Sequence, residues 1–189
     1  RDPEMSRGLG DVYKRQVLTV DGAYKAADFI NFCDAYDIPV LSLTNVKGYA
    51  ADVRSEKSIA KAVAKLTYAF ANANVPKVNV ITGEAYGSAY VTMNSKALGA
   101  DVTYAWPDAS IGMMDANEAA KIMYADKPEL LAKKAAEYAA LQNNVVSAAQ
   151  RGYVDSIIDP EQTRKYVVAA FEMLYSKKAG IIDKKHGTV

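Results

Sequence analysis

The sequence predicts an α/β fold with a mostly parallel sheet covered by helices. Short apolar runs alternate along the chain with amphipathic stretches, and the segments between them are short. Strands that alternate with helices pair in parallel, because a parallel pair needs a crossover connection. The chain also has 32 Ala, and small side chains allow helices to approach a sheet closely. A length of 189 residues leaves room for one domain of ordinary size.

Apolar runs and their spacing place the individual elements. The expected strands are Val17–Val20, Val40–Thr44, Lys77–Thr82, Val102–Trp106, Ser110–Met113 and Tyr153–Ile158. The expected helices run from a cap at Asp21 to Tyr36, from Ser55 to the break at Asn72–Pro76, from Ser88 to Leu98, from Ala116 to Tyr124, from Pro128 to Gln150, and onward from Asp159. The segments 45–54 and 83–87 are expected to be connections.

The composition counts against several classes of function. Lys and Arg number 23 and Asp and Glu 22, so no broad electrostatic attraction to nucleic acid or an acidic membrane is expected. The single His, His186, argues against a His-rich metal site and a Ser-His-Asp hydrolase, and no metal site is predicted. The single Cys, Cys33, lies on an apolar helix face and predicts a buried thiol in a cytoplasmic protein. The sequence contains no apolar run of about 18 residues, so no membrane-spanning helix is predicted.

The first sixteen residues differ from the rest of the chain. Residues 1–16 have three Arg, no Ala and no apolar periodicity, and the first Ala is Ala23. The segment lacks the apolar core of a signal peptide and resembles translated adapter sequence; a native polar arm is the alternative. We therefore expect a non-native leader at 1–16 and a domain over 17–189.

The chemistry is expected at the turn from Gly83 to Tyr90, between a predicted strand and a predicted helix. The first N–H groups of a helix have no partner within the helix. Gly87, Ser88 and Ala89 carry little bulk to shield these groups, so two amides there can stabilise an oxyanion, aided by the helix dipole. The spacing matches neither a dinucleotide-binding G-x-G-x-x-G nor a P-loop. The plainer alternative is that small residues let the helix pack closely on the sheet.

Several blocks resemble the carboxyltransferase (beta) subunit of biotin-dependent acyl-CoA carboxylases and acyl-CoA decarboxylases. They occur in the same order as in that family, and they are similar to its C-terminal half only. The blocks are V-P-K-V-N-V-I-T-G-E-A-Y-G-S-A-Y (Val75–Tyr90), A-D-V-T-Y-A-W-P-D-A-S-I (Ala100–Ile111), F-C-D-A-Y-D-I-P-V-L (Phe32–Leu41), R-G-Y-V-D-S-I-I-D-P (Arg151–Pro160), S-K-K (Ser176–Lys178) and K-K-H-G (Lys184–Gly187).

The resemblance implies a crotonase-like (ClpP/crotonase) superhelical βαβ domain and a reaction. In that family, a carboxyl group moves between carboxybiotin and a short acyl-CoA such as acetyl-, propionyl- or methylmalonyl-CoA. The backbone amides of Ser88 and Ala89 are implied to receive the biotin ureido oxygen, and Gly87 to shape the turn. The implied partners are a biotin carboxyl carrier protein, biotin carboxylase or decarboxylase subunits, an N-terminal carboxyltransferase half and further copies in a homo-oligomer. Without the N-terminal half, we expect this chain alone to transfer no carboxyl group.

Further positions carry over from the family. Gly48, Tyr49 and Tyr90 are implied to lie at the biotin site, and Val91 near the acyl group, where it would influence acyl size. The segment Asn45–Tyr49 matches a family D-x-P-G-F loop, but Asn replaces the Asp and Lys replaces the Pro. The family helix start I-I-R-H-G-A-K is absent, which indicates a divergent branch.

Four interpretations remain open at this stage. The first is the carboxylase-type carboxyltransferase, and the second is the corresponding subunit of a sodium-pumping acyl-CoA decarboxylase. The third is a crotonase-type hydratase or isomerase, which would need carboxylates directed at the acyl group. The fourth is a non-catalytic half that only forms oligomers. Glu84, beside the turn, is interpreted as a surface carboxylate, with polarisation of the site as the alternative.

Overall fold

The computed structural model describes residues 16–177, which form seven strands and seven α-helices. The strands are β1 (Val17–Leu18), β2 (Val40–Val46), β3 (Gly48–Tyr49), β4 (Lys77–Tyr86), β5 (Val102–Ala105), β6 (Ser110–Gly112) and β7 (Ser156–Ile157). The α-helices are α1 (Val20–Ala35), α2 (Val53–Asn72), α3 (Gly87–Val91), α4 (Ala116–Met123), α5 (Leu131–Tyr138), α6 (Val145–Gln150) and α7 (Thr163–Leu174). Short 3₁₀ turns are η2 (Lys96–Leu98), η3 (Pro128–Leu130) and η5 (Pro160–Gln162), and η4 (Ala139–Asn143) is a π turn. The leader 1–15 and the tail from 178, with His186, lie outside the described residues.

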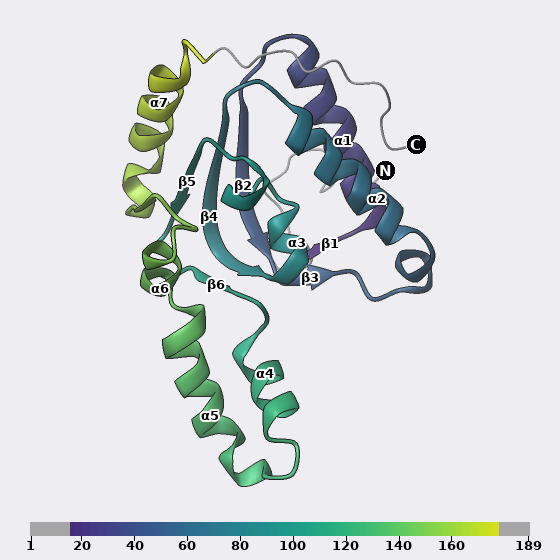
Figure 1. Ribbon diagram of the computed structural model, residues 1–189, viewed down its shortest axis with the longest axis vertical. Coiled ribbons are helices and arrows are strands. Elements are labelled where there is room, and N and C mark those ends of the chain that lie inside the picture. The colour runs from purple at the N-terminus through teal and green to yellow at the C-terminus, as the bar shows by residue number, and fades with distance from the viewer. Residues whose placement is uncertain (1–15, 178–189) are drawn as a thin grey trace.

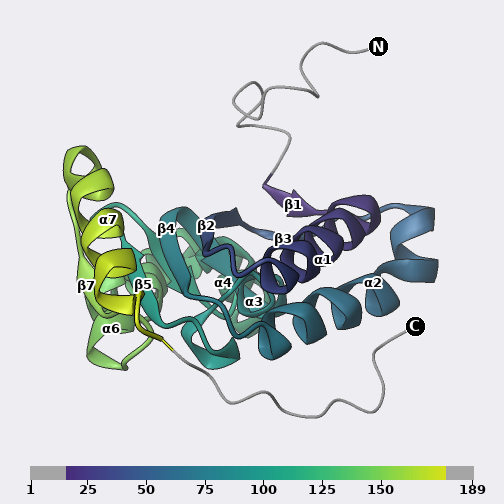
Figure 2. The same cartoon turned by 90° about the horizontal axis from the view of Figure 1, so that it is seen from above.

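The main sheet lies between two layers of helices (Figures 1 and 2). Helices α1 and α2 cover one face, and α7 covers part of the other. The core against α1 and α2 includes Ala27, Leu66 and Phe70, whereas the core against α7 includes Val80 and Val167. All pairings within the sheet are parallel, which confirms the expected α/β architecture.

Strand β4 is the centre of the sheet. The strand order is β2-β4-β5-β7, and β6 also pairs with the last residues of β4. The stretch Lys77–Ile81 is buried on both faces of the sheet, as expected for a parallel strand covered on both sides. Because β4 ends at Tyr86, its carboxyl end delivers the chain directly to α3.

The expected connection at 83–87 is wrong, because β4 continues through it to Tyr86. The pairing register with β2 shifts between Thr44 and Val46, which marks an irregularity. The Asn45 side chain fills it, since its Oδ1 accepts a hydrogen bond from the Glu84 N–H at 3.0 Å. A Cβ on Gly83 would lie 2.9 Å from that oxygen, so a larger residue here would displace the Asn45 side chain.

Helices α1 and α2 both start earlier than expected. Thr19, not Asp21, caps α1, and its Oγ1 accepts from the Gly22 N–H at 3.1 Å. The Asp21 carboxylate instead pairs with Arg54 at 2.6 Å. Asp52 caps α2, so the helix begins at Val53 rather than Ser55. In both cases a side-chain oxygen before the expected start satisfies a first-turn N–H group.

The long helices expected at 88–98 and 128–150 are also wrong. Helix α3 ends at Val91. The second region divides into η3, α5, the π turn η4 and α6. The division follows from two asparagines: Asn143 turns inward and donates to the Met114 carbonyl at 3.0 Å, and the Asn144 side chain caps α6.

Helices α4 and α5 form a hairpin that projects from the body (Figure 1). Its own small core contains Ala116, Ala120 and Ala135, with Leu131 and Tyr138 packed against them. The hairpin rejoins the body through η4. None of the helices among residues 16–177 is long and apolar enough to cross a membrane.

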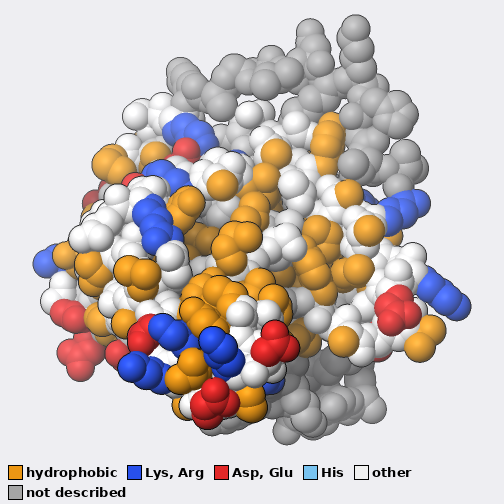
Figure 3. Space-filling view, turned by 60° about the horizontal axis from the view of Figure 1, so that its bottom comes forward, with side chains coloured by type: hydrophobic (Ala, Val, Ile, Leu, Met, Phe, Trp, Pro, Cys, Tyr) orange, Lys and Arg blue, Asp and Glu red, His pale blue; other side chains and the backbone are white. Residues whose placement is uncertain are grey.

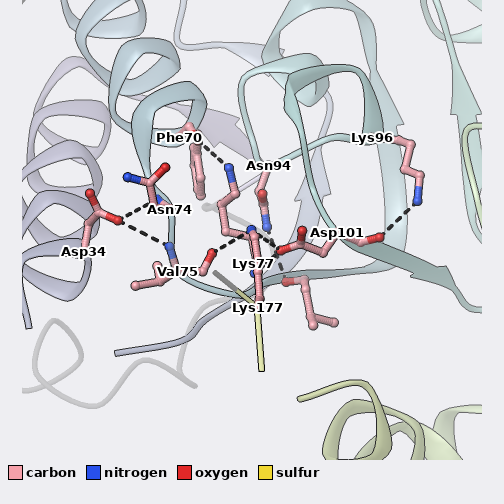
Figure 4. A network of polar contacts seen from close by, with 10 residues as sticks. Asp34, Phe70, Asn74, Val75, Lys77, Asn94, Lys96, Asp101 and Lys177 are labelled. Atoms are coloured by element: carbon pink, nitrogen blue, oxygen red, sulfur yellow. Dashed lines mark hydrogen bonds and ion pairs between the residues drawn. The ribbon is translucent and has the colours of Figure 1, made fainter. Parts of the chain in front are cut away.

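A polar network anchors the amino end of β4 (Figure 4). The Asp101 carboxylate accepts from the Lys77 N–H and from the Lys177 ammonium, each at 2.8 Å. Lys77 is 3% exposed, and its Nζ donates to the Phe70 carbonyl at 2.6 Å. Burial, reinforced by the charge of Lys177, lowers the pKa of the Lys77 ammonium. Asp101 thus ties the start of β4 to the segment that follows α7.

We expect Asp101→Ala to lower the free energy of unfolding by about 1–3 kcal/mol, because it leaves a backbone N–H and an ammonium without their acceptor. Urea denaturation measures the change. Asp126→Ala, at an exposed carboxylate after α4, is the control and should change stability by less than about 0.5 kcal/mol. Equal losses in the two variants would contradict the anchoring role.

Candidate functional site

Two cavities meet at the start of α3. The Val91 cavity has a volume of about 430 Å³ and is lined by Gly87, Ser88, Tyr90, Val91, Ser95, Ala97, Ile111, Gly112, Met113, Tyr138, Gln142, Ala148, Arg151 and Tyr153. The Tyr49 cavity has a volume of about 450 Å³ and is lined by Lys47, Gly48, Tyr49, Tyr86, Gly87, Ser88, Ala89, Met113, Met114, Asp115 and Glu118. Gly87, Ser88 and Met113 belong to both linings and therefore form the wall that the cavities share. Figure 3 shows apolar side chains gathered across the face of the molecule turned forward from the bottom of Figure 1.

Gly87 makes the turn that presents this wall. Its φ of 60° lies in the left-handed region, which side chains with a Cβ adopt only with strain. A Cβ at Gly87 would also lie 3.0 Å from the Met113 carbonyl oxygen. The close approach of the two segments therefore favours glycine here.

The amides of Ser88 and Ala89 lie in the first turn of α3, where N–H groups lack a partner within the helix. Tyr86, the residue that precedes the helix, provides no side-chain cap. Ser88 is exposed, whereas Ala89 is 1% exposed and fixes the helix to the core. Because α3 has five residues, its dipole is short, so the donors are the two N–H groups rather than a long helix.

The Tyr49 cavity carries a paired charge at its edge. The Lys47 ammonium lies 3.0 Å from the Glu84 carboxylate, and the hydrogen bond and charge of Glu84 raise the pKa of Lys47. Glu84 thus acts as the partner of the lysine that replaces the family proline. The segment 45–54, expected to be a connection, contains strand β3, which pairs with β1 and presents Gly48 and Tyr49.

Tyr90 is a neutral polar group in the Val91 cavity. It is 7% exposed, and burial, with a smaller effect of Tyr153, raises the pKa of its phenol to about 12. The hydroxyl therefore remains protonated at neutral pH and can only donate or accept hydrogen bonds.

The structure brings most of the expected site residues together. Gly48 and Tyr49 share the Tyr49 cavity with Ser88 and Ala89, although they lie far apart in the sequence. Val91 lines the other cavity and is 40% exposed. Tyr90 lines the Val91 cavity and not the Tyr49 cavity, which Gly48 and Tyr49 line.

Sequence reasoning missed part of the Val91 cavity: Met113, Tyr138, Gln142, Arg151 and Tyr153. One signal was available for Met113, because the carboxyl ends of the parallel strands β4 and β6 meet at one edge. No comparable signal places Tyr138 and Gln142, since their positions depend on the π turn η4. The described residues contain no cluster of His, Cys, Asp and Glu that would hold a metal ion.

Comparison with known proteins identifies the family. Residues 14–189 match the carboxyl transferase domain. The chain belongs to the carboxyl transferase family. It is 45% identical to the propionyl-CoA carboxylase beta chain of Saccharopolyspora erythraea over 184 residues, which are 91% of this chain and 34% of that protein. It is 42% identical to the methylmalonyl-CoA decarboxylase subunit alpha of Propionigenium modestum over 180 residues, 91% of this chain and 35% of that protein.

A solved relative confirms the crotonase-like fold. The transcarboxylase 12S structure, a hexamer with hydrolysed methylmalonyl-coenzyme A bound, superposes with a TM-score of 0.86 at 40% identity. That match covers 90% of this chain and 34% of the 12S chain. The chain thus spans about a third of the length of the curated relatives it matches. The resemblance stated from the sequence blocks is confirmed.

We expect Gly87→Ala to destabilise the protein by about 1–3 kcal/mol, because it adds both left-handed strain and contact with the Met113 carbonyl. Gly152→Ala is the matched control, since Gly152 also has a left-handed φ, 80°, but open space around its Cα. Chemical denaturation should show a smaller loss for the control. Equal losses would mean that the contact across the shared wall contributes nothing.

We expect the stability of the protein to fall between about pH 10, where an ordinary tyrosine ionises, and pH 12, because the unfolded chain loses the Tyr90 proton before the folded chain does. Tyr90→Phe removes this contribution, so its stability should fall less over the same interval. Denaturation at several alkaline pH values measures the difference. If the free energy of unfolding falls equally with pH in the two proteins, the raised pKa of Tyr90 is refuted.

Proposed function

We propose that this chain is the biotin-binding part of a carboxyltransferase that moves a carboxyl group between carboxybiotin and a short acyl-CoA of the propionyl or methylmalonyl type. The observation that supports it best is the wall at Gly87–Ala89, where two cavities flank a pair of first-turn amides in a chain of this family. A transfer between two ligands needs two adjoining sites with a common polar centre.

The residues around the Tyr49 cavity fit a biotin ring. Biotin supplies a ureido nitrogen that carries and releases the carboxyl group. The N–H groups of Ser88 and Ala89 would donate to the ureido oxygen and stabilise negative charge that develops there. Gly48 and Tyr49 provide part of the opposing lining. Fixed donors of this kind need no reorganisation during the reaction, and removing one typically costs about 10²–10³-fold in rate.

The Val91 cavity would receive the acyl end of the thioester. Its lining includes Val91, Ile111 and Met113, which suit a short apolar chain. Among the described residues, no Asp or Glu lines this cavity. A crotonase-type hydratase or isomerase needs a carboxylate directed at the acyl group, so the lining favours carboxyl transfer over that alternative.

The proposal extends to the partners of the whole protein. The activity would require an N-terminal carboxyltransferase half, a biotin carboxyl carrier protein, and biotin carboxylase or decarboxylase subunits, in a cytoplasmic homo-oligomer. The 12S relative is itself a hexamer. Relatives that carboxylate and relatives that decarboxylate match at similar identity, 45% and 42%, so both directions of transfer belong to the proposal.

We expect biocytin, a soluble biotin amide of lysine, to shift the backbone amide resonances of Ser88 and Ala89 in the ¹⁵N-labelled chain. Ser88→Ala keeps the amide and should retain the shift at Ala89 and the affinity within about threefold. Ser88→Pro removes the N–H at a helix position where proline is tolerated, and should weaken binding by about tenfold.

Amide resonances that stay unmoved at saturating biocytin would overturn the proposed site. Equal binding by the Ser88→Ala and Ser88→Pro variants would show that the Ser88 amide does not hold the ligand. Circular dichroism of both variants checks that each remains folded.

A further inference from the structure

The Val91 cavity contains a single charged residue. Its lining is mainly apolar, with Val91, Ala97, Ile111 and Ala148 among the contributors, and Arg151 is the one ionised side chain among the described residues that line it. The Tyr49 cavity, by contrast, is lined by Lys47, Asp115 and Glu118, and Lys47 is also paired with Glu84 at 3.0 Å. The two cavities therefore differ in their net charge as well as in their lining.

Arg151 is held beside the cavity by a neutral partner. Its Nη2 donates to Oε1 of Gln142 at 2.8 Å, and Gln142 lines the same cavity. Within residues 16–177 Arg151 forms no ion pair, whereas Lys134 on α5 has a carboxylate partner, Glu137. A guanidinium carries several N–H donors, so after the bond to Gln142 a pair remains for a second acceptor.

The position of the guanidinium follows from the break between α5 and α6. Arg151 follows the last residue of α6. Its backbone N–H donates to the Ser147 carbonyl at 3.2 Å. Gln142 lies in the π turn η4 on the preceding element. The bond between them therefore spans the turn and favours one placement of this exposed side chain at the edge of the cavity.

We propose that Arg151 is a specificity-determining residue that recognises a carboxylate on the short, branched acyl group in the Val91 cavity. This inference rests on the proposed function, because it assigns the cavity to the acyl substrate. The apolar side chains contact the hydrocarbon part, and the guanidinium forms charge-assisted hydrogen bonds with the carboxylate. The cavity thereby favours the carboxylated acyl group over its uncharged counterpart.

Two small probes of nearly equal shape test this assignment. Isobutyrate carries a branched apolar stem and a carboxylate, and isobutyramide carries the same stem without the charge. Amide shifts of Val91 and Gly112 in the ¹⁵N-labelled chain report binding in the cavity. We expect isobutyrate to bind about tenfold more tightly than isobutyramide.

Variants of the arginine separate its charge from its geometry. Arg151→Gln should reduce the ratio of the two affinities to about one, and Arg151→Lys should leave an intermediate ratio, because lysine keeps the charge but lacks the planar fork. Arg164→Gln, at an exposed arginine on α7, is the matched control and should retain the ratio of the unmodified chain. The melting temperature of each variant is measured as well, because a lower value in the Arg151 variants would indicate a role in folding.

Several outcomes would overturn the proposal. They are equal binding of the two probes, an unchanged ratio in Arg151→Gln, or binding of inorganic phosphate as tight as that of isobutyrate, which would indicate a general anion site. Biocytin binding by the same samples keeps the two proposals distinct. In the unmodified chain, equal binding of the two probes with normal biocytin shifts refutes only the role of Arg151. A clear preference for isobutyrate without biocytin shifts refutes only the biotin site.

Discussion

Strand β4 has hydrogen-bonded neighbours along both edges, β2 on one side and β5 followed by β6 on the other. Helices cover both faces of its first half, so the strand cannot shift in register without exposing buried side chains or unpairing backbone groups. Its amino end is tied through Asp101 to the segment that follows α7, and its carboxyl end leads into α3. The position of the turn at Gly87–Ala89 therefore depends on the position of this one strand.

This arrangement allows a reaction centre built from backbone rather than from side chains. Backbone amides at the end of a rigid strand have fixed positions and no rotamers, which suits donors that must meet a developing charge. The same wall separates a cavity lined by Lys47, Asp115 and Glu118 from a cavity whose one charged side chain among residues 16–177 is Arg151. The site thus combines a common polar centre with two different electrostatic environments.

The runs and spacing of apolar residues were sufficient to predict that β2, β4 and α2 exist, because these elements place apolar side chains in the core. The same pattern misplaced the starts of α1 and α2 by a few residues, and it failed more widely where an element depends on a distant partner. Tyr86 remains in strand because β6 pairs with it, and Gly48–Tyr49 is a strand only because β1 lies beside it. The turn at Gly87–Ala89 was identified from small residues at a strand-to-helix boundary. Arg151 and Gln142 were not, because a π turn that periodicity does not reveal brings them together.

The single thiol of the chain has a practical consequence. Cys33 is 2% exposed in the layer formed by α1 and the sheet, and burial raises the pKa of its thiol. A thiol reagent can reach Sγ only when α1 moves away from its neighbours, so the rate of labelling reports local opening of that layer. The protein thus carries a natural reporter for loosening of the layer that α1 forms on the sheet.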